Sequence, residues 1–323
     1  MHSAEVTRTN AAGAPERAAL EAQRAQQRRR LRLRRIRDRI VETLLLLAGL
    51  LAVFITAAIV YILVSESVPF FAHVPLRDFL TDTMWTPLFD QPRFGILPLV
   101  AGTLVTTGVA LCLAIPCGTV IALYLSEFAS HRLRESVKPV LELLGAVPTV
   151  VYGYFALQMV TPFLQRFIPG LPGFNMLSPG LVIGIMIVPY VASVSEDAMR
   201  AVPNTMREGS YAMGATRFQT AVRVVMPGAL SGIAAAYVLG ISRAVGETMV
   251  VAVAAGLQPN LTWNPLESAA TITSFIVQVS LGDLPHGSVG YQSIFAAGLV
   301  LMLTTLAFNV VGVLLTRRFR EVY

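Results

Sequence analysis

Long uncharged apolar stretches recur along this sequence and limit what the chain can fold into. An α-helix needs roughly 20 residues to cross the hydrocarbon core of a bilayer. Six apolar windows reach or approach this length, at residues 41–64, 96–124, 140–161, 178–195, 229–257 and 291–316. Only 14% of the residues are charged, whereas an ordinary soluble domain has roughly 25%. The sequence therefore predicts an all-α integral membrane protein with six transmembrane helices.

The distribution of basic residues predicts the orientation of these helices. Six membrane crossings place both chain ends on the same side of the membrane. Of the 25 Lys and Arg residues, 21 lie on that side, and 11 of these are in residues 1–40. Cytoplasmic segments carry the excess of positive charge, so both termini are predicted to be cytoplasmic in a bacterial plasma (inner) membrane. We interpret the basic tail as a topology anchor that attracts anionic membrane lipid, rather than as a nucleic-acid-binding arm.

The predicted organisation follows from these boundaries. A basic tail (1–40) precedes the first transmembrane helix (41–64), an external loop (65–95), a core of five helices (96–316) and a cytoplasmic end (317–323). Pro148 lies inside the third apolar window and removes a backbone hydrogen bond, so that helix is predicted to be kinked or broken. In the external segment 258–290, helical spacing of apolar residues predicts an amphipathic helix that lies on the outer surface or rests on the bundle; these residues are Ile272, Phe275, Ile276 and Val279.

The fifth helix carries two ionisable residues at its centre, Arg243 and Glu247. Arg243 is the one basic residue assigned to the membrane interior, where a charge costs about 2.5 to more than 10 kcal/mol. Its side chain must therefore face protein or water, and a guanidinium suits an oxyanion. Glu247, four residues later, is expected one turn along the same face. Two interpretations stay open: the pair lines a substrate pathway, with hydroxyl contacts from Ser242 and Thr248, or the two charges neutralise each other inside the bundle.

The cytoplasmic loop 203–228 is predicted to form two short helices. Thr205-x-x-Glu208 and Thr216-x-x-Gln219 both have the spacing of a capping box. Gly214 lies between the two helices, where a left-handed residue would end the first, and Pro227 is expected to end the second. The second helix would expose an apolar stripe, formed by Phe218, Val222 and Val225.

This loop resembles the coupling loop of permease subunits of ABC importers, which reads Glu-Ala-Ala, three residues, Gly, nine residues, Ile, one residue, Leu-Pro. The matching residues are Glu208, Gly214, Val224, Met226 and Pro227. Gly209 and Ser210 replace the two usual alanines, and Val224 and Met226 replace Ile and Leu. The resemblance implies a type I importer permease fold and a coupling helix that docks on an ATPase. The implied coupling residues are Glu208, Gly214, Phe218, Val222 and Pro227.

The chain itself is not predicted to be an enzyme. It has no Gly-x-x-x-x-Gly-Lys-Ser/Thr segment, and its only lysine, Lys138, precedes Pro139, so no ATP-binding loop is expected. We also predict no catalytic residue, no metal site and no cofactor bound by this chain. ATP and Mg²⁺ would be held by a partner ATPase.

Three longer segments resemble the PstC-type subunits of phosphate importers, within a similarity that covers about residues 95–320. They read LELLGAVPTVVYGYFAL, RAVPNTMREGSYAMGATRFQTAVRVVMPGALSGI and LGISRAVGETMVV. The resemblance implies a permease that forms half of a phosphate pathway, with a PstA-type permease, a PstB-type ATPase dimer and an external phosphate-binding protein as partners. Two alternatives remain: a permease for phosphonate, sulfate or molybdate, or a membrane scaffold or sensor without a transport role.

Overall fold

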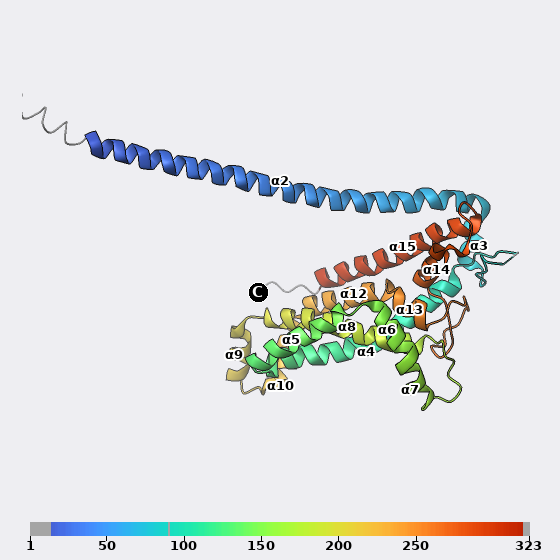
Figure 1. Cartoon of the computed structure of the whole chain (residues 1–323). Helices are drawn as coiled ribbons and strands as arrows, with labels where there is room; N and C mark the ends of the chain where they lie inside the picture. Colours follow the sequence, from blue (N-terminus) through green and yellow to red (C-terminus); the bar gives the residue numbers. More distant parts are fainter. Residues whose placement is uncertain (1–13, 90, 319–323) are drawn as a thin grey trace, which may run out of the picture. The chain divides into compact units, whose positions relative to one another are not determined.

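The computed structural model describes the backbone of residues 14–89 and 91–318, and the side chains of residues 38–89, 91–314, 316 and 317. Within these ranges the regular secondary structure is helical, apart from an isolated antiparallel bridge between Trp85 and Phe94, and loops connect the helices (Figure 1). Four helices are long and apolar enough to cross a membrane, or up to six spans if each of two bent helix pairs counts as one. The all-α membrane fold is confirmed. The chain divides into two units, Met1–Ile62 and Leu63–Tyr323.

The first helix, α2 (Ala14–His73), is longer than the predicted first span. The apolar residues 41–64 lie inside it, and the backbone stays helical on both sides of them. Residues 14–40 are rich in Arg, Ala and Leu, which are strong helix formers, so the polar stretch does not interrupt the helix. Residues 1–13 of the predicted basic tail and 319–323 of the predicted cytoplasmic end lie outside the described residues.

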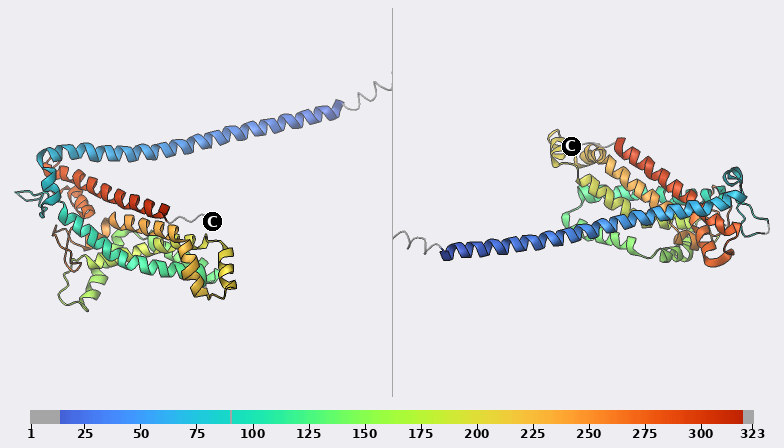
Figure 2. Two further views of the ribbon diagram at one scale, coloured as in Figure 1. Left: turned by 180° about the vertical axis from the view of Figure 1, so that it is seen from behind. Right: turned by 90° about the horizontal axis from the view of Figure 1, so that it is seen from above.

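The helices that pack together in the second unit include α4 (Leu97–Leu123), α8 (Leu177–Arg200), α12 (Leu230–Val245) and α15 (Val289–Arg318). α8 packs against both α4 and α12, and α12 packs against α15, as can be followed in Figure 2. A Cβ at Gly184 would lie 2.8 Å from the carbonyl oxygen of Ala110, and one at Gly118 would lie 2.7 Å from the side chain of Val191. Small residues therefore let α4 and α8 approach closely.

The predicted break at Pro148 is confirmed. α5 (His131–Ala146) ends before this residue, α6 (Thr149–Phe155) begins after it, and the chain bends by 87° between them. Pro148 cannot donate a hydrogen bond to the carbonyl of Leu144, four residues earlier. The hydroxyl of Tyr152 donates to that carbonyl instead, at 2.6 Å. The span continues through η2 (Ala156–Val160) and α7 (Thr161–Gln165).

On the predicted external side, α14 (Ile272–Gln278) confirms the expected helix and rests on the bundle. The backbone N–H of its first residue donates to the hydroxyl of Thr103 on α4 at 3.1 Å. The ring of Phe275 meets that of Trp85 edge to face, with 4.9 Å between the ring centres. The remaining external helices are α3 (Leu76–Thr81) and η4 (Val279–Asp283).

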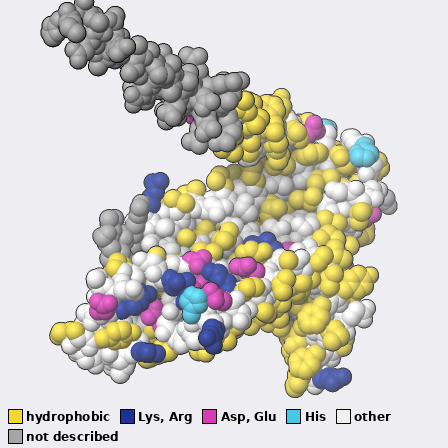
Figure 3. All heavy atoms as spheres, turned by 60° about the vertical axis from the view of Figure 1, so that its left-hand side comes forward, with side chains coloured by type: hydrophobic (Ala, Val, Ile, Leu, Met, Phe, Trp, Pro, Cys, Tyr) yellow, Lys and Arg dark blue, Asp and Glu magenta, His cyan; other side chains and the backbone are white. Residues whose placement is uncertain are grey.

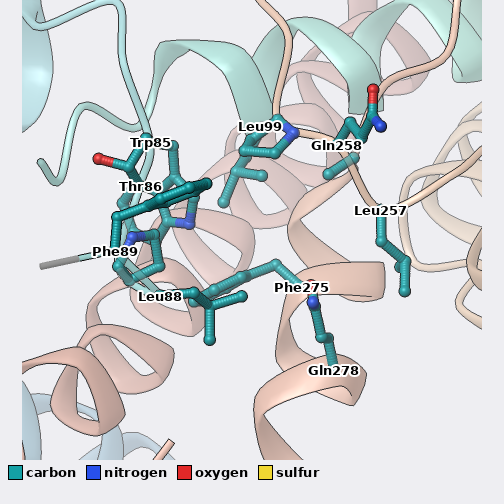
Figure 4. A pocket seen from close by; sticks show the side chains of 12 residues that line it. Trp85, Thr86, Leu88, Phe89, Leu99, Leu257, Gln258, Phe275 and Gln278 are labelled. Carbon is teal, nitrogen blue, oxygen red and sulfur yellow. The ribbon is translucent and has the colours of Figure 1, made fainter. Parts of the chain in front are cut away.

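An apolar pocket of about 220 Å³ lies in this external region (Figure 4). Leu99, Leu257 and Phe275 line it from three different segments, and the buried Nε1–H of Trp85, also in its wall, makes no hydrogen bond to any described residue. None of the described residues that line the pocket carries a charge. The pocket therefore offers an anion no counter-charge, and an anion site has to be sought elsewhere in the bundle.

Candidate substrate pathway and coupling surface

The fifth predicted helix is broken beside its two ionisable residues. α12 ends at Val245, and α13 (Met249–Ala254) begins after residues 246–248. The carboxylate of Glu247 is turned toward the start of α13, where Oε1 accepts hydrogen bonds from the first two backbone N–H groups at 3.2 and 3.3 Å. Local bonds of this kind compete with a continuous helix, and Gly246 has a low helix propensity. Glu247 thus starts a second helix instead of extending the first.

Glu247 was expected one turn from Arg243 along one helix face, but the two residues do not lie in one continuous helix. α12 ends at Val245, and Glu247 belongs to the interruption before α13, which begins at Met249. Among the described residues no ion pair involves Arg243. Each of the two side chains has a different neighbour in the structure.

Arg243 lies over an aromatic ring of α8. Its guanidinium carbon is 4.4 Å from the ring centre of Tyr190, within the reach of a cation–π interaction. The Nε atom of Arg243 is buried and has no hydrogen-bond partner among the residues that the structure describes. Sequence reasoning missed Tyr190, although a polar aromatic residue directly after Pro189 in an apolar span was an available signal. Arg243 is thus a partly buried cation whose Nε–H group is unsatisfied within the described part of the chain.

The two hydroxyls predicted beside Arg243 form hydrogen bonds with other groups. Ser242 donates to Oδ1 of Asn309 on α15 at 3.1 Å. Thr248 donates to the carbonyl of Gly246 at 3.1 Å, within the break itself. The roles of Ser242 and Thr248 as substrate contacts stay predictions.

A hydroxyl from the external helix also reaches the break. Thr273 of α14 donates to the backbone carbonyl of Glu247 at 2.8 Å, and both residues are buried. This contact fixes the position of the segment between α12 and α13. The site is therefore assembled from α8, α12, α13 and α14.

The predicted helix pair of the cytoplasmic loop is present. Its elements are α9 (Asn204–Ala212), α10 (Arg217–Thr220), η3 (Ala221–Val225) and α11 (Met226–Gly228). Gly214 has φ +83° between the two helices, a conformation that glycine adopts without a steric cost. The second helix meets α12 at an angle of 72°. The expected role of Gly214 in ending the first helix is confirmed.

One of the two predicted capping boxes is confirmed. Thr216 accepts a hydrogen bond from the backbone N–H of Gln219 at 3.3 Å, and Oε1 of Gln219 accepts one from the N–H of Thr216 at 2.9 Å. The box at Thr205 is wrong, because Pro203 occupies the cap position and the helix already begins before Thr205. The expected stop at Pro227 is also wrong, because the helix runs through this residue to Gly228. The π-helical η3 just before Pro227 already departs from the α-helical hydrogen-bond pattern, which accommodates the missing N–H.

The exposed face of the loop differs in part from the predicted stripe. Phe218 is 63% exposed and Val222 is 38% exposed. Val225 is buried against α4 and α8 residues, so its predicted place in the stripe is wrong. Met213, which sequence reasoning missed, is 89% exposed. We define the coupling surface as Met213, Phe218 and Val222, with the exposed Glu208 beside them in the loop.

An ion pair holds the coupling loop against the bundle. Arg207 of α9 donates to both carboxylate oxygens of Glu127, at 2.9 and 3.3 Å, and Glu127 belongs to η1 (Tyr124–Phe128) at the end of α4. The side chains of Arg207 and Glu127 are only 13% and 6% exposed. Arg207 also donates to the carbonyl of Met199 on α8 at 2.8 Å. Two-point pairing of this kind fixes orientation as well as distance, so α9 has a defined position.

A second charged cluster joins α5 to the end of α8. Glu196 is fully buried and lies 2.9 Å from Nζ of Lys138, which also contacts Asp197 at 2.7 Å. Arg134 and Arg200 approach the same carboxylate at 4.0 and 3.7 Å. Acidic and basic side chains gather on one part of the surface in Figure 3. The described residues contain no group of three His, Cys, Asp or Glu side chains that could hold a metal ion.

Solved structures of type I ABC importers contain chains with a similar fold. An inward-facing structure of the MetNI methionine ABC transporter has a TM-score of 0.53 and 17% identity, and the match covers 70% of this chain and 94% of that chain. A bacterial ABC transporter involved in the import of alginate gives a TM-score of 0.57 with 18% identity, over 84% of this chain and 96% of that chain. At these identities the likeness shows the fold alone. The chain thus has the type I importer permease fold.

The model of one protein family, described as "Binding-protein-dependent transport system inner membrane component", matches residues 114–321. The chain belongs to this family. It is 36% identical over 231 residues to the probable ABC transporter permease protein YqgH of Bacillus subtilis, covering 72% of this chain and 74% of that protein. It is 36% identical over 249 residues to the phosphate transport system permease protein PstC 1 of Mycobacterium tuberculosis, covering 70% and 73%. The PstC protein of Mesorhizobium japonicum is 31% identical, with 70% and 74% covered.

Proposed function

We propose that this chain is a permease subunit of an ATP-driven phosphate importer and forms half of its transmembrane pathway. The names of the PstC relatives supply the substrate. The observation that carries the proposal is Arg243, a partly buried cation with an unsatisfied Nε–H beside a break in its span. A guanidinium remains charged at every relevant pH and binds phosphate oxygens well. The proposed pathway therefore passes Arg243 and Glu247, and Ser242 and Thr248 are its flanking hydroxyls.

The proposed pathway holds phosphate only transiently. Glu247 brings a negative charge to the same break, and like charges repel. A permeating anion is thereby attracted by Arg243 and kept from binding too tightly. High affinity belongs in this scheme to an external phosphate-binding protein.

The proposed partners follow the organisation of such importers. A homologous PstA-type permease completes the pathway, and a PstB-type ATPase dimer binds ATP and Mg²⁺, so this chain holds no cofactor of its own. The coupling surface supports the ATPase contact, because Phe218 and Met213 are exposed on a helix pair that a buried ion pair holds in place. Apolar side chains on such a helix fit a groove on a partner. Glu208, Gly214, Val222 and Pro227 complete the proposed coupling segment.

We place the protein in the bacterial inner membrane with both termini in the cytoplasm. The excess of basic residues on that side supports this orientation. The Lys138 cluster and the Arg207 pair then lie at the cytoplasmic end, where charged side chains meet water and lipid headgroups. α14 lies on the opposite, external face, where a binding protein docks.

The test is phosphate uptake by the whole transporter in proteoliposomes, with the ATPase inside and the phosphate-loaded binding protein outside. We expect uptake that requires ATP, and we expect Arg243→Ala to abolish it while the complex still assembles. Arg166→Ala, which changes an external basic residue, is the matched control and should transport normally. Normal uptake by the Arg243→Ala complex would contradict the pathway assignment.

Two other outcomes correspond to the alternative functions. Stronger competition by sulfate, molybdate or a phosphonate than by unlabelled phosphate would identify a permease for another oxyanion. An assembled complex that hydrolyses ATP but accumulates none of these anions would indicate a scaffold or sensor.

A further inference from the structure

The charge of Arg243 needs a partner when no anion is present. A cation inside a membrane is unfavourable unless protein, water or another charge compensates it. Among the described residues no carboxylate pairs with Arg243, and the carboxylate of Glu247 is bound to the start of α13. The described group that lies against the guanidinium is the ring of Tyr190, at 4.4 Å.

We propose that Tyr190 is a positioning residue that holds Arg243 ready for an anion. The face of an aromatic ring attracts a cation by its quadrupole. Unlike a carboxylate, it does so without occupying the strong N–H donors of the guanidinium. The unsatisfied Nε–H of Arg243 agrees with this arrangement. In this scheme the ring compensates the charge in the empty pathway, and the Nε–H group is not taken up by another described residue before phosphate arrives. This inference rests on the proposed function, because it assigns phosphate to the pathway.

The ring of Tyr190, and not its hydroxyl, carries this role. No hydrogen bond of the Tyr190 hydroxyl is found within the part of the chain that the structure describes, whereas Tyr152 on α6 uses its hydroxyl to satisfy Leu144. Tyr190 also lines a cavity of about 380 Å³ between α5 and α8, together with Glu142 and Ser193. Tyr190 therefore contacts both the guanidinium and this cavity, and a smaller side chain at position 190 would remove the ring contact of Arg243.

The test varies the ring face while the size of the side chain stays nearly constant. Position 190 receives Phe and then Phe with one, two or three ring fluorines, which weaken the negative ring face step by step. In the complete reconstituted transporter, the maximal rate of phosphate uptake should be within about 2-fold of wild type for Tyr190→Phe. It should fall with each fluorine, by about 2- to 30-fold over the series, which matches the range of cation–π energies. Tyr190→Leu should behave like the most fluorinated variant.

A second kinetic readout separates positioning from a general structural defect. The KM for the phosphate-loaded binding protein should stay unchanged along the series, because binding-protein docking does not involve Tyr190. The rate of ATP hydrolysis should also stay within about 2-fold of wild type, so that fewer phosphate ions are transported per ATP. A flat response to fluorination, or equal uptake by the Phe and Leu variants, would overturn the proposal.

A measurement without transport distinguishes this inference from the proposed function. The sample for this NMR measurement is the complex with isotope-labelled arginine, in lipid nanodiscs without phosphate. The Nε–H proton resonance of Arg243 is assigned by its loss in Arg243→Lys. We expect the Tyr190 ring to shift this resonance upfield. The shift should persist in Tyr190→Phe and vanish in Tyr190→Leu. If the shift is present but uptake is insensitive to fluorination, the inference fails and the proposed function stands. If Arg243→Ala transports normally, the proposed pathway fails whether or not the contact exists.

Discussion

Replacing Glu127 by glutamine should loosen α9 from the bundle. The carboxylate of Glu127 accepts two hydrogen bonds from Arg207, at 2.9 and 3.3 Å, and both side chains are largely buried. Glutamine keeps the shape of the side chain but removes the charge and one of the two acceptor oxygens. The guanidinium of Arg207 then stays largely buried without a counter-charge.

The expected loss of free energy for docking α9 depends on which hydrogen bonds Arg207 retains. Removing one partner of a buried ion pair typically costs about 3–5 kcal/mol. Arg207 still donates to the backbone carbonyls of Met199 and Val202, so we expect a value near the lower end, about 3 kcal/mol. A loss of this size raises the fraction of complexes with α9 undocked by on the order of 100-fold.

Hydrogen exchange of the assembled transporter measures this opening directly. Backbone amides of residues 204–212 should exchange about 100-fold faster in Glu127→Gln, and less phosphate should be transported per ATP hydrolysed. The control is Glu135→Gln, because Glu135 pairs with His131 on the surface, with side chains 64% and 70% exposed. Such a pair contributes at most about 1 kcal/mol. Equal exchange in the two variants would refute the reasoning.

Two further substitutions test other parts of the structure. Tyr152→Phe removes the hydroxyl that satisfies the Leu144 carbonyl beside the break, so thermal unfolding should reveal a loss of about 1–3 kcal/mol; Tyr154→Phe, at a side chain 58% exposed, should leave the midpoint unchanged. Identical midpoints for both variants would show that this hydrogen bond does not support the break. Phe218→Asp should reduce the amount of ATPase that purifies with the complex, whereas Phe174→Asp, on the external side and 50% exposed, should not. Undiminished ATPase in the Phe218→Asp complex would contradict the coupling surface.

The break at Pro148 could be predicted from the sequence because its cause is local. A proline lacks the N–H that a helix needs at that position, whatever surrounds it. The same holds for Gly214 and for the capping box at Thr216, where the relevant atoms lie within a few residues. The six apolar windows could be recognised for a similar reason, since the run of apolar residues that indicates a possible span lies within the window itself.

The break beside Arg243 could not be predicted in this way. Gly246 and Thr248 lower helix propensity only modestly, and the sequence does not show that the Glu247 carboxylate will turn to the next backbone N–H groups. The cation–π partner is even less accessible, because Tyr190 belongs to another helix and reaches Arg243 only through the packing of α8 against α12. Val225 was misplaced for the same reason, since its burial depends on contacts with distant helices.

The position of α14 has a mechanical consequence. Its first backbone N–H is bound to Thr103 of α4, and the hydroxyl of Thr273, one residue further, is bound to the carbonyl of Glu247. The short external helix is thus fastened at neighbouring residues to a rigid long helix and to the interruption between α12 and α13. A force that displaces α14 must either stretch these two hydrogen bonds or move the segment that follows Arg243. The hydroxyl of Thr273 and the packing of α14 against α13 therefore connect this short helix to the interrupted span.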